Sequence, residues 1–103
     1  MHRVIANIKF LRADEGGRTQ SVPVMDFGCP VFFVDVSKLA EHGYDARLLV
    51  REYGRPIAPG DSVEGIGLVF LSPEEVLPNI IPGNRFTLWE GKTIARGTIV
   101  GAE

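Results

Sequence analysis

The chain has 103 residues, of which 45% are hydrophobic, and this suits one soluble domain with a single core. Its formal net charge of −2 argues against a general nucleic-acid binder, which usually carries a basic excess. The single cysteine excludes an internal disulfide, and no apolar run approaches the ~20 residues of a membrane span. Residues 1–3 lead directly into a strand-like segment rather than a signal peptide, so we expect one cytoplasmic domain over residues 1–103, with no membrane partner.

Alternating apolar residues predict a first strand over residues 3–12. One face of this strand would hold Val4, Ala6, Ile8 and Phe10. A turn follows at residues 14–17, because the paired glycines there tolerate positive φ. The run VFFV within residues 30–36 is too short for a helix and is rich in β-formers. It predicts a strand that is either buried on both sides or covered by a loop.

The middle of the chain adds a helical turn and another strand. Residues 37–43 predict one helical turn, with Ser37 as N-cap and Gly43 as the stop. Residues 44–53 alternate and predict a strand. Its inward residues would be Ala46, Leu48 and Val50, and its outward residues Asp45, Arg47 and Arg51. Residues 55–61 are a proline-containing connection that ends in a turn.

Residues 62–71 predict a strand with two internal glycines. Gly65 and Gly67 indicate a bend or bulge of the kind that closes a barrel. The clearest helix start follows at Ser72, an N-cap followed by a proline and then by Glu75, the acid of a capping box. A second proline ends this helix within about a turn.

The chain ends in a predicted β-hairpin. Residues 85–89 and 93–100 are short apolar strands around a polar tight turn at residues 90–93. Six strands with little helix indicate an all-β fold, either a sandwich or a barrel. Because closure leaves no unpaired edge, we expect a closed six-stranded Greek-key-like barrel with one or two short helical turns.

Few residues are suited to catalysis. The glycines lack the following Gly-Lys-Ser/Thr of a Walker A loop, so we expect no GTP hydrolysis by this chain alone. His2 and His42 have neither the spacing nor the neighbouring cysteines of a zinc site. Cys29 could be a nucleophile with His42 as base, although a cysteine before an apolar strand is more often a packed side chain. We expect no enzyme, cofactor or metal; an acid/base pair formed by tertiary proximity stays open.

Four basic residues fall at or near turns and strand ends. They are Arg18, Arg85, Lys92 and Arg96. If the first and last strands adjoin, these cations would form one patch suited to phosphates or to an acidic partner. The alternative is an ordinary solvated barrel rim.

Trp89 is a candidate contact for a partner. With Phe86 and Leu88 facing the core, alternation leaves Trp89 partly exposed just before the turn. An exposed tryptophan is a common interface anchor. The alternative is that its ring covers the end of the barrel.

Five short motifs occur in an order that matches a known family. They are residues 15–18 (EGGR), 28–32 (GCPVF), 57–63 (IAPGDSV), 83–88 (GNRFTL) and 90–97 (EGKTIARG). Together they span nearly the whole chain, which resembles the C-terminal β-barrel, the third domain, of elongation factor Tu and related translational GTPases. The second and fifth motifs are each one residue shorter than in the family, and residues 72–82 are an extra proline-rich segment.

The resemblance implies surfaces for both protein and RNA. In the family this barrel packs on a second barrel and on the GTPase domain, meets exchange factors, and contacts the T-stem of aminoacyl-tRNA. By likeness, Arg18 and Lys92 would lie where basic residues approach RNA phosphates, with Arg85 beside them.

Three classes of function follow from these observations. We expect a stand-alone, non-catalytic binding module that acts on a protein partner. The alternative is binding of tRNA or another structured RNA through the four basic residues. A small enzyme or ligand binder is the third reading, and it would need a pocket inside a barrel that side chains usually fill. A homodimer is a further expectation if an apolar surface is left exposed.

Overall fold

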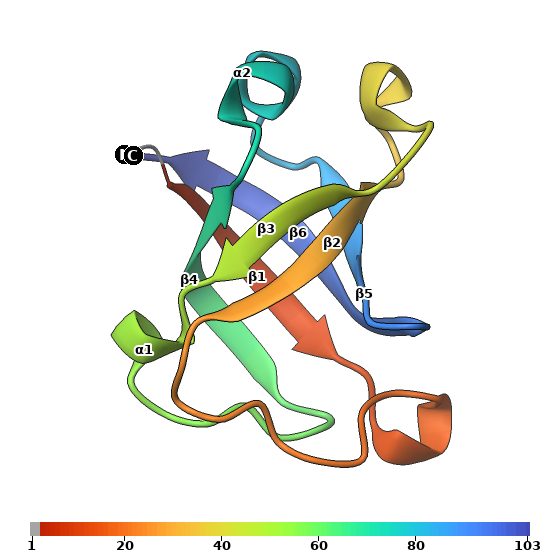
Figure 1. The fold of residues 1–103 in the computed structure, drawn as a ribbon, viewed down its shortest axis with the longest axis vertical. Coiled ribbons are helices and arrows are strands. Elements are labelled where there is room, and N and C mark those ends of the chain that lie inside the picture. The colour runs from red at the N-terminus through yellow and green to blue at the C-terminus, as the bar shows by residue number, and fades with distance from the viewer. Residues whose placement is uncertain (1–2) are drawn as a thin grey trace.

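The first strand, β1 (Val4–Phe10), pairs on one side with β4 (Ser62–Phe70) and on the other with the last strand, β6 (Thr93–Ala102). The remaining strands are β2 (Phe27–Phe33), β3 (Tyr44–Leu48) and β5 (Arg85–Trp89). In the computed structural model, which describes residues 3–103, all pairs are antiparallel and the order β1-β4-β3-β2-β5-β6 closes on itself (Figure 1). The predicted closed six-stranded barrel is confirmed. Met1 lies outside the described residues, as does His2, one of the two histidines considered as possible zinc ligands.

The connections follow a Greek key. Strands β2, β3 and β4 are paired consecutively, and β1 lies beside β4. Alternation along each strand sends every second side chain inward. The predicted inward residues of β1 are all buried, as are Phe86 and Leu88 of β5. No charged side chain is buried within residues 3–103, so the interior is apolar.

Gly65 produces the bulge expected in β4. Its φ is 69°, and the pairing with β1 shifts register between Ala6 and Ile8. The Asn7 side-chain oxygen accepts a hydrogen bond of 2.9 Å from the Gly65 backbone N–H, which satisfies a donor that the shifted ladder leaves free. The bulge bends β4 as the closing barrel requires.

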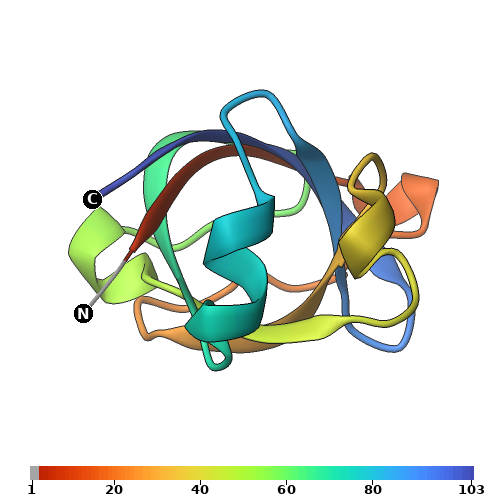
Figure 2. The ribbon, with the colours of Figure 1, turned by 90° about the horizontal axis from the view of Figure 1, so that it is seen from above.

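Short helical turns lie at the two ends of the barrel. They are η1 (Ala13–Glu15), η2 (Ser37–Leu39), α1 (Val50–Tyr53), α2 (Pro73–Val76) and η3 (Leu77–Asn79). Figure 2 looks onto one end, where α2 lies across the opening and fully buries Val76. Elsewhere a bridge joins Val22 to Ile57, both buried. Among residues 3–103 there is no helix with the length and apolar character needed to cross a membrane.

The strand predicted for residues 44–53 is too long. β3 ends at Leu48, and α1 follows and ends at Tyr53, with Gly54 (φ 90°) as its C-cap. The predicted inward and outward sets are right, but Leu49 is buried as well. Leu49 packs on the outer side of β4, where a Cβ on Gly67 would lie 2.8 Å from its Cδ1. The buried Leu49 thus breaks the alternation directly after the end of β3.

The VFFV run is a strand with one covered outer residue. β2 begins at Phe27 and ends at Phe33, so the predicted segment 30–36 is displaced. Val31 and Phe33 are buried, while Val34 is exposed. The outward Phe32 is half-buried because the loop at Gly43 covers it: a Cβ on Gly43 would lie 2.8 Å from Phe32 Cζ. Of the two alternatives, the covering loop is right.

Helix capping differs from the prediction. Ser72 is the N-cap of α2 and a proline follows, but the Ser72 side chain makes no capping hydrogen bond; its carbonyl accepts from the Glu75 N–H at 3.1 Å. A capping acid acts instead at η1, where Glu15 accepts from the Arg12 backbone N–H at 2.9 Å. Ser37 lies inside η2 rather than at its cap.

Gly97 of β6 tests how tightly the interior is filled. A Cβ there would lie 2.3 Å from Cζ of the buried Phe86 ring. We expect Gly97→Ala to lower the free energy of unfolding by about 1–3 kcal/mol, because the ring must move within a packed core. Gly101→Ala, in the same strand with nothing within 4 Å, is the matched control and should change it by less than about 0.5 kcal/mol. Equal denaturant midpoints for the two variants would show that the core has room.

Candidate binding surface

The outer face of β2 and β5 carries an aromatic pair. Trp89 ends β5 and is 43% exposed, as the alternation predicts. Its ring meets the Phe32 ring edge-to-face, with centroids 6.3 Å apart and an interplanar angle of 68°. Phe32 lies opposite Thr87 in the register, two residues before Trp89. The pair is held in place by strand pairing and leaves the tryptophan accessible to a partner.

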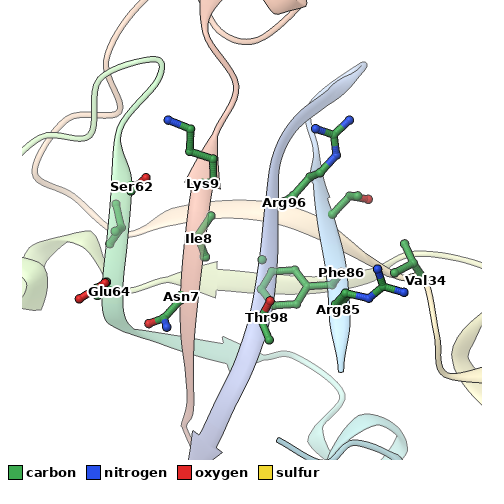
Figure 3. A pocket seen from close by; sticks show the side chains of 13 residues that line it. Asn7, Ile8, Lys9, Val34, Ser62, Glu64, Arg85, Phe86, Arg96 and Thr98 are labelled. Atoms are coloured by element: carbon green, nitrogen blue, oxygen red, sulfur yellow. The ribbon is translucent and has the colours of Figure 1, made fainter. Parts of the chain in front are cut away.

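A shallow groove of about 570 Å³ crosses the outer face of the neighbouring strands β4, β1, β6 and β5 (Figure 3). We call it the outer groove. Its charged side chains are Lys9, Arg85, Arg96 and Glu64. Its uncharged polar side chains are Asn7, Ser62, Thr87 and Thr98. Cations therefore outnumber carboxylates here, although the whole chain has a net charge of −2.

Two of these cations occupy opposite positions on a strand pair. Lys9 of β1 lies opposite Arg96 of β6 in the register, and Figure 3 shows both side chains on the same outer face. The Lys9 ammonium donates to the Gly60 carbonyl oxygen. Arg96 forms no ion pair with any residue from 3 to 103. Like charges directly opposite each other on a sheet are destabilising by a few tenths of a kcal/mol or more.

Arg85 is oriented at the edge of the groove by Asp35. Its Nε lies 3.2 Å from Asp35 Oδ2, and its backbone N–H donates to Asp35 Oδ1 at 3.0 Å. The backbone hydrogen bond, followed by the guanidinium, lowers the pKa of Asp35 below its ordinary value. The carboxylate thus stays charged and compensates part of the Arg85 charge.

Arg18 and Lys92 lie in a separate, smaller hollow around Glu90. The Arg18 Nη1 donates to both carboxylate oxygens of Glu90, at 2.6 and 2.7 Å. Its guanidinium also lies 5.2 Å from the centroid of the Phe27 ring, and its side chain is only 18% exposed. The structure therefore places the four predicted cations in two groups, Arg85 with Arg96 and Arg18 with Lys92. Arg18 is already engaged within the fold.

This difference predicts unequal effects on stability. We expect Arg18→Ala to lower the free energy of unfolding by about 1–2 kcal/mol, because it removes a charge-assisted hydrogen bond and a cation–π contact. Lys92→Ala, which removes an exposed cation from the same hollow, should change it by less than about 0.5 kcal/mol. Thermal unfolding compares the two. If Arg18→Ala is as stable as the parent chain, Arg18 is a free surface cation after all.

Cys29 and His42 do not form a nucleophile–base pair. Cys29 is buried, and this burial, with a smaller effect of nearby Glu90 and Asp45, raises the pKa of its thiol to about 12. His42 packs on Tyr44 with centroids 4.3 Å apart, and its Nδ1 lies 2.9 Å from the Gly43 carbonyl oxygen. A neutral, enclosed thiol is a poor nucleophile. In the part of the chain that the structure describes, no three His, Cys, Asp or Glu side chains are grouped to hold a metal.

The Cys29 thiol should accordingly react slowly in the folded protein. At pH 8 we expect Ellman's reagent to modify native Cys29 on the order of 100-fold more slowly than the guanidinium-unfolded chain. The reason is that both access and the thiolate fraction are reduced. Comparable rates in the two states would contradict the burial of this thiol.

No model of a known protein family matches this chain, and no curated protein is significantly similar to it. The arrangement of its own side chains therefore indicates what it can do. An accessible tryptophan lies beside cations and hydroxyls on the outside of a packed barrel, which suits non-covalent recognition. Sequence reasoning missed Lys9, whose only signal was its outward position in the first strand.

Proposed function

We propose that this chain is a non-catalytic binding module that recognises a protein partner through the outer face of β2, β5 and β6. The observation that carries the proposal is the exposed Trp89, held edge-to-face against Phe32. Apolar side chains fill the interior, so a partner has to be met on the outside.

The composition of this surface favours a protein partner. Tryptophan and arginine are the residues most enriched where binding energy concentrates in protein interfaces. Here Arg96 lies on the strand next to Trp89, opposite Thr87, which comes two residues before Trp89. An apolar anchor bordered by charged and hydroxyl side chains has the layout of an interface core with its rim.

We also propose kinship with the third domain of elongation factor Tu. The closed antiparallel six-stranded barrel is the fold that the resemblance implies. A relative of that domain would act by binding partners of a translation factor, in the cytoplasm. The single cysteine, a free thiol, is consistent with such a reducing compartment.

Binding of a structured RNA is the second candidate. Three cations and one carboxylate in the outer groove favour it, since phosphates are recognised by such clusters. Salt separates the two candidates. Binding driven by many phosphates weakens steeply as salt rises, whereas an interface with an apolar anchor and a few carboxylate contacts weakens less.

Trp89→Ala tests the proposal. The chain would first be used to capture its partner from native lysate, with and without nuclease treatment of the lysate. The affinity of the chain for the purified partner would then be measured. We expect Trp89→Ala to weaken binding by about 30-fold or more, the loss of an anchor worth at least ~2 kcal/mol. Met25→Ala, at another exposed apolar side chain (55%), is the control and should bind as the parent does.

If a protein partner binds Trp89→Ala as tightly as it binds the parent chain, the proposal that recognition occurs on this surface is refuted. Capture that disappears on nuclease treatment would favour RNA instead.

A further inference from the structure

We propose that the outer groove is a carboxylate-binding subsite, in which Lys9 and Arg96 take acidic side chains of the protein partner while Trp89 takes its apolar anchor. This inference rests on the proposed function and names the chemistry of the partner: an acidic segment with an apolar residue beside it.

The first support is the unfavourable pairing of the two cations. Lys9 and Arg96 lie directly opposite each other on β1 and β6, an arrangement that weakens a strand pair. Arg96 has no carboxylate partner within residues 3–103, whereas Arg18 and Arg85 each have one. A local arrangement that works against stability is expected where function requires it.

The second support is the row of donors around them. In the register, Ser62 lies opposite Lys9, and Thr87 lies opposite Arg96. Ser62, Lys9, Arg96 and Thr87 therefore form one line across four strands of the outer face, two cations between two hydroxyls. Such a line offers charge-assisted hydrogen bonds to carboxylate oxygens, and an arginine fork can take a carboxylate with two of them.

The third support is the presence of a carboxylate at each side of the groove. Glu64 lines it on β4, and Asp35 holds Arg85 at the β5 edge. Figure 3 shows Glu64 beside Asn7, on the side of the groove away from Arg85 and Arg96. A continuous phosphodiester strand along the groove would approach these carboxylates. A few carboxylates on a protein segment need only the two central cations, so the charge pattern favours the acidic protein.

A short synthetic peptide of glutamates flanked by leucines is the probe, with a deoxythymidine strand of the same length as comparison. Binding to the 103-residue chain would be followed by backbone amide shifts at Lys9, Thr87 and Arg96. We expect saturable shifts with the peptide. The double variant Lys9→Gln/Arg96→Gln should weaken peptide binding about tenfold or more. The matched control Arg47→Gln/Arg51→Gln removes two exposed arginines that lie outside the groove and should bind as the parent does.

Absence of saturable shifts, or equal loss in both double variants, would overturn the inference. Tighter binding of the deoxythymidine strand would overturn it in favour of nucleic acid. With the natural partner, weakened binding by Trp89→Ala but not by Lys9→Gln/Arg96→Gln would reject the subsite and leave the proposed function standing. If neither variant weakens that binding, both fail.

Stability provides an independent readout. Arg96→Glu replaces a like-charge pair by an opposite-charge pair, so it should raise the thermal midpoint by about 1–6 °C while abolishing peptide binding. A lower midpoint would show that Arg96 supports the fold, and the inference would fall.

Discussion

The pairing of β1 with β6 is the constraint on which the rest of the structure depends. It joins the first and last strands and leaves the barrel without an open edge. The same register sets Ile8 inward against the core and Lys9 outward against Arg96. A slip of one residue would carry Lys9 into an apolar interior, so packing fixes the register strongly. The β1–β6 register thus sets both the inward core residues and the outward groove residues of these two strands.

Much of the fold could be predicted because burial on one face of a strand leaves a period of two. β1 and β5 follow that period, as does β6 beyond the consecutive buried pair Ile94 and Ala95, and the bulge at Gly65 was indicated by glycines within a strand. The prediction was wrong after Leu48, where consecutive apolar side chains are buried on different sides. Leu49, directly after β3, is buried against the outer side of Gly67 in β4, and a contact between residues this far apart in the sequence is not visible in local alternation.

The candidate surface could be predicted only in part, for a related reason. The exposure of Trp89 follows from its position relative to Phe86 and Leu88, which is local information. The grouping of the cations depends on the register and on distant partners. Arg18 pairs with Glu90, 72 positions away, and Lys9 lies opposite Arg96 only because the barrel closes.

Methyl-resolved NMR of the full chain with its purified partner tests most directly whether recognition lies on the outside of a filled barrel. The account predicts that binding shifts the outward methyl groups of Val34, Thr87 and Thr98, while those of the inward Leu88 and Ile94 keep their positions. Shifts concentrated on Leu88 and Ile94, with the outward methyl groups unchanged, would mean that the barrel opens to its ligand and would contradict the account.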